Sequence, residues 1–276
     1  MNKEKIRKIL VSILCIAFVS ILIVEIIPGI KEKNIKSRVF KDMQKESSSA
    51  MRGIIGIIPE SEIKGQASHN GIGSGVIFAK KDDTYYAVTA KHVVEDKNNK
   101  YKVFTRDTKF SGETVRANPE VTFEIPDKNY YDSLLNAKLE YNSETNDLSI
   151  ISFKYDGNLE VLEFATKNPA KKDKIMVIGH PEGDKYKITY GYIKSGLENI
   201  KTKTSSGKAI TQKIIKHDAY MKPGNSGGVA LNKNMKITGI NVAGSFTLLG
   251  HFRAGYMIPY NIVQECIKEW EKNNNK

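Results

Sequence analysis

From residue 51 onward the sequence predicts an all-β fold, arranged as one barrel or a pair of barrels with a helix at the C-terminus, and preceded by an N-terminal transmembrane helix. Three observations predict the β fold: many short β-branched segments, glycine-rich turns between them, and no helical period before the final residues. Of the 276 residues, 40% are hydrophobic and 27% charged. This composition excludes a collagen, a low-complexity chain and a fully disordered chain.

The N-terminus predicts a membrane anchor. A short basic tail, 1–8, precedes an apolar stretch, 9–27, whose 19 residues would form a helix about 28 Å long, close to the roughly 30 Å of a bilayer core. No small-x-small cleavage site follows it, and Leu14 before Cys15 argues against lipidation. We therefore predict an uncleaved signal anchor, with a cleaved signal peptide and a buried core helix as alternatives.

Orientation is less well defined, because lysines and arginines flank the apolar stretch on both sides. The short tail makes an N-in, C-out anchor the default. Residues 28–50 are polar and basic, which predicts a juxtamembrane linker or helix, and a folded domain is expected over 51–276.

The folded domain begins with short apolar segments separated by turns. The predicted strands are, in chain order, Arg52–Ile58, Gly75–Phe78, Tyr85–Thr89, Tyr101–Thr105, Val121–Glu124, Leu148–Phe153, Lys174–Ile178, Lys187–Ile193, Ile210–Ile215, Gly228–Leu231, Ile237–Val242 and Arg253–Ile258. The one clear helix follows, because apolar residues from Ile262 to Trp270 recur on one helical face. Only a polar tail comes after Trp270, so no further C-terminal module is expected.

Charge and cysteine content limit the possible partners. The net charge is +12 and the pI about 9.4, which suits nucleic acid, an anionic polymer or a membrane surface, and equally a basic surface that maintains solubility. Cys15 and Cys266 exclude a disulfide scaffold and a cysteine-based zinc site. His69, His180, His217 and His251 lack the spacing of zinc ligands, so no metal and no cofactor are expected.

The strongest functional pattern is the segment Lys222–Gly228, with the sequence KPGNSGG. A tight glycine turn exposes the hydroxyl of Ser226 and directs the backbone N–H groups of Gly224 and Ser226 toward one point, as an oxyanion hole requires. The alternative interpretation is an ordinary β-turn.

Two further residues complete a candidate triad. His92 follows the predicted strand Tyr85–Thr89 and is suited to accept and return a proton. Asp147 leads into Leu148–Phe153, where it can orient the imidazole. Each alone is more typical of a structural residue, but the order His92, Asp147, Ser226 matches the triad order of a two-barrel protease fold. Asp127 and Asp132 are competitors for the acid, but 125–135 is predicted to be a loop.

These motifs resemble the chymotrypsin-like serine peptidases, in particular the bacterial branch that includes the HtrA/Deg proteases and the glutamyl endopeptidases. The resemblance runs from about Ala50 to Trp270, through GSGVI at 73–77, TAKHV at 89–93, DLSII at 147–151, GHPEG at 179–183 and HDA…PGNSGG at 217–228. It implies two six-stranded antiparallel Greek-key barrels, peptide or protein substrates, and a location on the outer face of a bacterial membrane. HtrA proteases usually carry a C-terminal PDZ domain, and none fits this sequence.

The resemblance also implies a substrate pocket. Tyr220 occupies the position six before the nucleophile, and Asn241 stands where glutamyl endopeptidases have histidine. With Ala243 these residues would form a pocket that prefers a small or medium aliphatic side chain.

The sequence therefore predicts a membrane-anchored serine endopeptidase, with protein quality control or processing implied by analogy. A catalytically idle barrel that binds other molecules is the alternative, and a protease kept latent until its oxyanion turn is ordered is also compatible. No nucleic-acid partner is expected, and the sequence specifies no oligomeric state.

Overall fold

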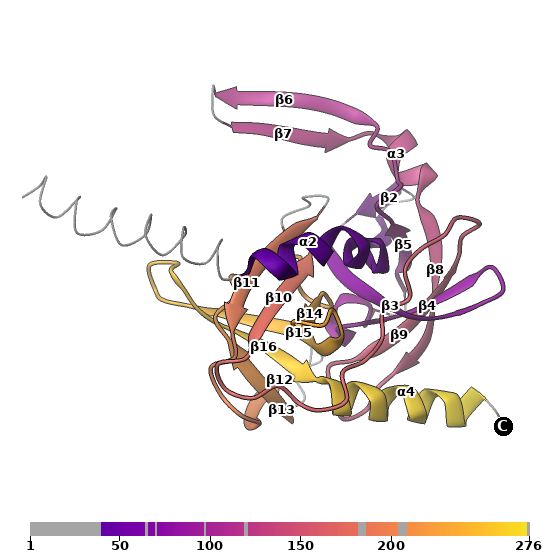
Figure 1. The fold of residues 1–276 in the computed structure, drawn as a ribbon. Coiled ribbons are helices and arrows are strands. Elements are labelled where there is room, and N and C mark those ends of the chain that lie inside the picture. The colour runs from indigo at the N-terminus through magenta and orange to yellow at the C-terminus, as the bar shows by residue number, and fades with distance from the viewer. Residues whose placement is uncertain are drawn as a thin grey trace, which may run out of the picture. The chain divides into compact units, whose positions relative to one another are not determined.

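The computed structural model describes residues 40–63, 66–69, 71–96, 98–118, 121–181, 186–203 and 209–274 (Figure 1). Contacts divide the chain into two units, 1–42 and Met43–Lys276, and the second contains both large sheets. The predicted anchor at 9–27 lies outside the described residues and stays a prediction. No helix in the described part of the chain is long and apolar enough to cross a membrane.

The first sheet closes into a six-stranded antiparallel barrel. Its strands are, in order of pairing, β1 (Ile54–Ile63), β3 (Gly73–Lys81), β4 (Thr84–Thr89), β9 (Ser149–Lys154), β8 (Leu135–Asn142) and β5 (Lys100–Phe104), which pairs back with β1. A further strand, β2 (Gln66–His69), pairs with the end of β1. Closure leaves few unpaired edges, which makes the barrel a rigid support for the turns at its rim.

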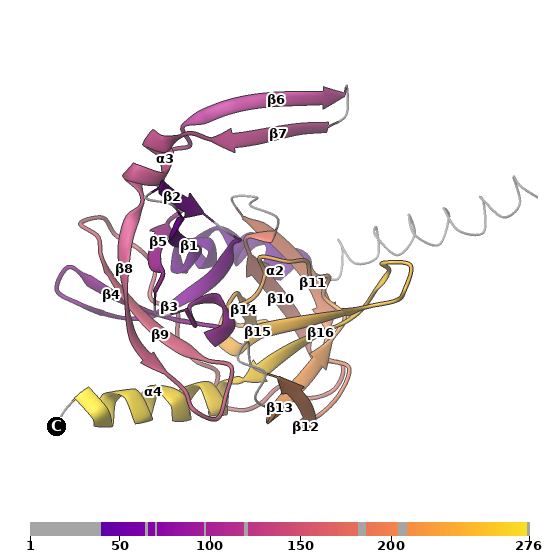
Figure 2. The ribbon, with the colours of Figure 1, turned by 180° about the vertical axis from the view of Figure 1, so that it is seen from behind.

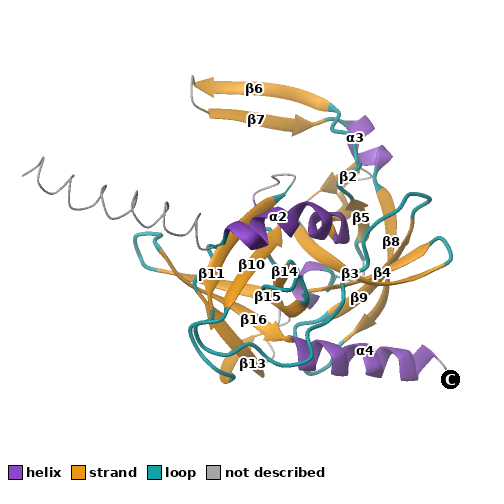
Figure 3. Ribbon diagram, in the orientation of Figure 1, coloured by secondary structure: helices purple, strands orange, loops and turns teal. Residues whose placement is uncertain are grey.

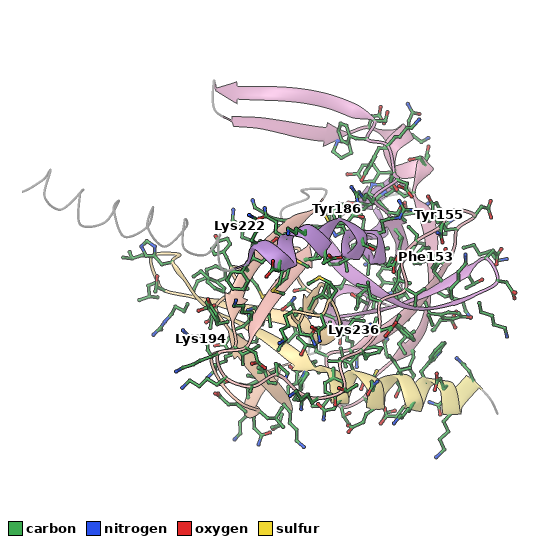
Figure 4. The ribbon with its side chains drawn as sticks, in the orientation of Figure 1. Phe153, Tyr155, Tyr186, Lys194, Lys222 and Lys236 are labelled. Atoms are coloured by element: carbon green, nitrogen blue, oxygen red, sulfur yellow. The ribbon has the colours of Figure 1, made fainter. Side chains whose placement is uncertain are left out.

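The core of this barrel explains why these segments form strands. Alternate side chains point inward, and Ile55, Ile57, Ile77 and Ile151 are fully buried. Each such side chain contributes roughly 1.5–3 kcal/mol through its burial. Phe153 stacks on the ring of Tyr85 with 5.8 Å between ring centroids, and its side chain can be located in Figure 4.

The second sheet also has seven strands (Figure 2). Their order is β11 (Lys187–Tyr192), β10 (Lys174–Gly179), β14 (Val229–Leu231), β15 (Ile237–Phe246), β16 (Phe252–Pro259), β13 (Ala209–His217) and β12 (Glu198–Lys203). The ends of β11 and β13 meet, because Ile193 and His217 form a β-bridge and Lys194 N–H donates to the Lys216 carbonyl at 2.8 Å. Buried residues from these strands, including Ile175, Ile215 and Met257, form a second core cluster.

Helices and one hairpin complete the fold (Figure 3). Helix α4 (Tyr260–Asn274) follows β16 and, as predicted, buries one face, while its Trp270 packs against Phe78 and Tyr86 of the first barrel at 6.0 and 5.1 Å. The remaining elements are α2 (Lys41–Ala50), α3 (Lys128–Ser133), and the separate two-stranded sheet of β6 (Gly112–Asn118) and β7 (Val121–Pro126).

The structure differs from the sequence prediction at polar segments. Every predicted strand overlaps an observed one, but β2, β6, β8 and β12 were not predicted because polar residues interrupt their apolar pattern. The predicted loop at 125–135 is wrong: α3 lies within it, and Asp127 caps this helix by accepting the Tyr130 N–H at 2.8 Å. Residues 41–50, predicted as part of a linker or juxtamembrane helix, are helical.

Candidate active site

His92 and Asp147 are in direct contact. His92 lies in a single 3₁₀ turn, Lys91–Val93, just after β4, and Asp147 lies just before β9. Because β4 and β9 are antiparallel neighbours with Thr89 opposite Ser149, the end of one strand and the start of the other lie side by side. The His92 Nδ1 atom is 2.7 Å from Asp147 Oδ2, and the His92 backbone N–H donates to Oδ1 at 2.9 Å. Both carboxylate oxygens therefore orient His92.

The loop that carries Asp147 is tied to the His92 turn. Lys91 donates from Nζ to the carbonyl of Ser143 at 2.8 Å. Ser143 in turn donates its N–H to the Leu148 carbonyl at 3.0 Å and accepts the Asn146 N–H on its hydroxyl at 3.2 Å. Lys91 thus ties the loop that carries Asp147 to the turn that carries His92.

The contact with Asp147 changes the basicity of His92. Burial lowers the pKa of His92, but the hydrogen bond that its ring donates to Asp147 and the negative charges of Asp147 and Glu95 outweigh this effect. The net result is a pKa raised above the usual 6.5. The His92 side chain is 41% exposed, so the ring remains accessible from solvent. The pair is therefore suited to accept a proton near neutral pH.

Ser226 follows a tight turn. The Asn225 N–H donates to the Lys222 carbonyl at 3.1 Å, with Pro223 second in the turn and Gly224 third at a φ of 97°, as in a type II β-turn. A residue with a side chain would be strained at that φ, which explains the glycine. Lys222, where the turn begins, is labelled in Figure 4.

The turn is anchored to β15 on its other side. Gly227 donates its N–H to the Asn241 carbonyl at 2.7 Å, and Asn241 donates its N–H to the Gly228 carbonyl at 2.8 Å. These two bonds fix the chain immediately after Ser226. The serine is therefore held between the type II turn and the second sheet.

The Ser226 turn packs against the strand end that leads to His92. Gly227 lies so close to the Ser74 carbonyl and the Thr89 hydroxyl that a Cβ at this position would not fit. Ser74 N–H also donates to the Ser226 carbonyl at 2.8 Å. Among the described residues, however, the Ser226 hydroxyl forms no hydrogen bond with His92. The structure thus brings His92 and Asp147 together and places Ser226 on a turn beside the same strand end.

The Gly224 and Ser226 backbone N–H groups, predicted to form an oxyanion hole, are not used in other hydrogen bonds within the described structure. Of the described backbone around the turn, the Asn225, Gly227 and Gly228 N–H groups are all paired, whereas those of Gly224 and Ser226 donate to no described acceptor. Buried backbone N–H groups are nearly always paired, and Gly224 is buried. Two N–H donors on one turn, neither of which has an acceptor, provide the chemistry needed to bind a negatively charged oxygen.

The three predicted pocket residues differ in their exposure and in their contacts. Tyr220 is 41% exposed and its ring packs edge-on against Phe252 at 5.1 Å. Ala243 is partly buried on β15. Asn241 has no exposed surface: its Oδ1 lies 3.1 Å from His217 Nε2, and its Nδ2 donates to the Gly228 carbonyl at 3.1 Å. The Asn241 side chain therefore supports the Ser226 turn, and its place in a substrate pocket stays a prediction.

Three of the other histidines, His69, His180 and His217, lie in structural surroundings away from His92. Burial lowers the pKa of His217 to about 4 and that of His180 to about 3, so both are neutral near pH 7. His69 contacts Glu60 at 2.9 Å and stacks on Tyr131. Within the described residues, no three histidine, cysteine or acidic side chains form a group that could hold a metal ion.

Sequence reasoning missed the role of Ser74. It lies in the motif GSGVI, which indicated only a strand before the histidine motif. In the structure Ser74 is fully buried and its hydroxyl donates to the Gly224 carbonyl at 2.7 Å. A polar residue between two glycines in an otherwise apolar strand is the one sequence signal that could have indicated a buried contact.

The fold, the His92–Asp147 pair and the Ser226 turn define a protein of the serine-peptidase class. The model of the trypsin-like peptidase domain matches residues 73–240, and the chain belongs to this family. Among its curated relatives is a "Serine protease HtrA-like" protein of Staphylococcus aureus strain MRSA252, 29% identical over 82% of this chain and 28% of the relative. The protein of the same name in strain USA300 is 30% identical over 75% of this chain and 24% of the relative.

A solved structure shows the same fold. The active form of the Rv3671c protease from M. tuberculosis aligns with a TM-score of 0.60 at 15% identity, covering 80% of this chain and 82% of that one. The chain spans only about a quarter of the length of the curated relatives named above.

Proposed function

We propose that this chain is a serine endopeptidase in which Ser226, His92 and Asp147 act together. Ser226 Oγ attacks the carbonyl carbon of a peptide bond while His92 Nε2 takes its proton, and Asp147 holds the ring and stabilises the imidazolium. His92 then gives the proton to the leaving amine, and water releases the acyl group from Ser226 by the reverse sequence. The N–H groups of Gly224 and Ser226 bind the oxyanion that develops in each step.

The observation that carries this proposal is the two-point contact between Asp147 and His92, beside a turn whose Gly224 and Ser226 donors are unpaired. The Nδ1 contact leaves Nε2 of His92 as the nitrogen for proton transfer. The missing hydrogen bond between Ser226 and His92 is compatible with this proposal, because such bonds are often long without substrate.

Two finer features belong to the same proposal. The contact between the ends of β11 and β13 supports a second six-stranded barrel, with β12 as an extension. The apolar stretch at 9–27 supports a single-pass anchor that holds the protease domain on the outer face of a bacterial membrane. The preference for small or medium aliphatic residues stays a prediction that rests on Tyr220, Asn241 and Ala243.

Covalent labelling with a fluorophosphonate probe tests the proposed function. In the full chain we expect the probe to modify the wild type, because Oγ attacks its phosphorus with loss of fluoride, and mass spectrometry should find the adduct on Ser226. The Ser226→Ala variant should stay unlabelled and the His92→Ala variant should label far more slowly. A wild-type chain that folds but is not labelled would favour the catalytically idle barrel. With a probe that cannot cross membranes, labelling in intact cells also tests the orientation.

A further inference from the structure

Ser74 connects the first barrel to the proposed oxyanion turn. It lies on β3 and has no exposed surface. Its hydroxyl donates to the Gly224 carbonyl at 2.7 Å and its N–H donates to the Ser226 carbonyl at 2.8 Å. One residue of the first barrel thus holds two carbonyl groups of the turn that carries Ser226.

These two bonds restrict the peptide groups around Ser226. A peptide is planar, so holding the Gly224 carbonyl fixes the plane before Asn225, and holding the Ser226 carbonyl fixes the plane after Ser226. Between them lies the peptide that carries the Ser226 N–H. Gly224 and Gly227 both have positive φ, and glycine populates many other backbone conformations, so the sequence alone does not hold this arrangement.

The surroundings of Ser74 direct its single hydroxyl proton toward Gly224. The backbone N–H of His180 donates to the Ser74 oxygen at 3.0 Å, and His180 Nδ1 lies 3.4 Å from the same oxygen. His180 is enclosed by Phe104 and Tyr186, with ring centroids 4.7 and 4.5 Å away; the Tyr186 side chain is labelled in Figure 4. The His180 N–H occupies a lone pair of the Ser74 oxygen, and the Gly224 carbonyl at 2.7 Å is a much nearer acceptor for the hydroxyl proton than His180 Nδ1.

We propose that Ser74 is a positioning residue, whose hydroxyl holds the Gly224–Ser226 segment in the conformation that presents its two N–H groups to the oxyanion. This inference rests on the proposed function and adds a residue that touches no substrate. It acts on the transition state, because the oxyanion exists only there, and it leaves ground-state binding of the peptide largely unchanged.

The test compares Ser74→Ala with Ser152→Ala in the full chain. Ser152 is a matched control, since it is also a buried serine of the first barrel, and its hydroxyl donates to Glu140 at 2.6 Å, with no contact to the turn. We expect Ser74→Ala to lower kcat by roughly 10- to 100-fold, less than the loss of a direct oxyanion donor. KM should change by less than about threefold, as expected for a group that acts only in the transition state.

Two further readouts separate positioning from loss of structure. Inhibition by a peptide boronate, which places an anionic oxygen in the hole, should weaken in parallel with kcat. The acid limb of the pH profile, which reports on His92, should not move. Ser74→Cys, with a weaker donor of similar size, should lie between wild type and Ser74→Ala, and it carries the test if the alanine variant fails to fold.

The proposal is overturned if Ser74→Ala keeps kcat within about twofold of the wild type, or if kcat, KM and the acid limb all change together as general damage would cause. These results differ from failure of the proposed function, in which the wild type itself neither hydrolyses peptides nor is labelled.

Discussion

Replacing Ser226 by alanine is expected to lower kcat about a millionfold, as loss of the nucleophile does in a serine protease of another fold. Without the hydroxyl no acyl-enzyme can form, and the remaining oxyanion donors and bound substrate accelerate only a slow attack by water. The thermal midpoint should stay close to that of the wild type, because the Ser226 hydroxyl makes no hydrogen bond in the described structure.

Steady-state hydrolysis of a casein or peptide substrate measures this effect. Ser195→Ala is a suitable control, since that hydroxyl donates to the Gly196 carbonyl at 2.9 Å and accepts the Lys216 N–H at 3.1 Å, with no hydrogen bond to the Ser226 turn. The control should keep wild-type activity. If Ser226→Ala hydrolysed substrate as fast as the control, Ser226 would not be the nucleophile.

Replacing Asp147 by asparagine is expected to lower kcat about 10⁴-fold, the loss measured for the corresponding change in a trypsin-type triad. The amide can donate a hydrogen bond to Nδ1 and so favours the tautomer that has its proton on Nε2. In that tautomer Nε2 cannot accept the proton of Ser226. The side chains are nearly equal in size, so the fold should be retained.

The same variant should shift the pH profile. The base must be neutral, so kcat/KM of the wild type should rise with a midpoint above 6.5, because Asp147 helps to raise the pKa of His92. Removing the carboxylate leaves burial as the largest influence, which lowers the pKa, so the residual activity should rise at lower pH than in the wild type.

Asp127→Asn is the matched control, because Asp127 was the competing candidate for the triad acid. In the structure it caps α3 and accepts the Ser111 hydroxyl at 2.8 Å, without contact to His92. Its substitution should leave both kcat and the pH profile unchanged. Equal losses in the two variants would contradict the assignment of Asp147.

The sequence was informative wherever local chemistry and chain order were distinctive. Apolar, β-branched segments predicted most strands of both sheets, and the glycine pattern around Ser226 predicted a tight turn. The order His92, Asp147, Ser226 along the chain selected the three residues of the candidate triad. The pairing of β4 with β9 explains why His92 and Asp147 are in contact.

Other features depend on contacts between distant segments and leave little local signal. Ser74 contacts Gly224, 150 residues later, only because the fold brings β3 against the turn that carries Ser226. Asn241 was expected at a substrate pocket, but its side chain is occupied by His217 and Gly228. Strand β8, with the sequence LNAKLEYN, mixes polar and apolar residues and is recognisable only through its pairing with β5 and β9.

The central claim is that Ser226, His92 and the Gly224 and Ser226 donors converge on one reacting carbonyl. A crystal structure of the protein with a peptide boronate tests it most directly, since tetrahedral boron mimics the reacting carbon. We expect boron bonded to Ser226 Oγ, one boronate oxygen within hydrogen-bond distance of both N–H groups, and His92 Nε2 facing Oγ while Asp147 holds Nδ1. Boron bound elsewhere, or a His92 ring that stays out of reach of Ser226 in the complex, would contradict the account.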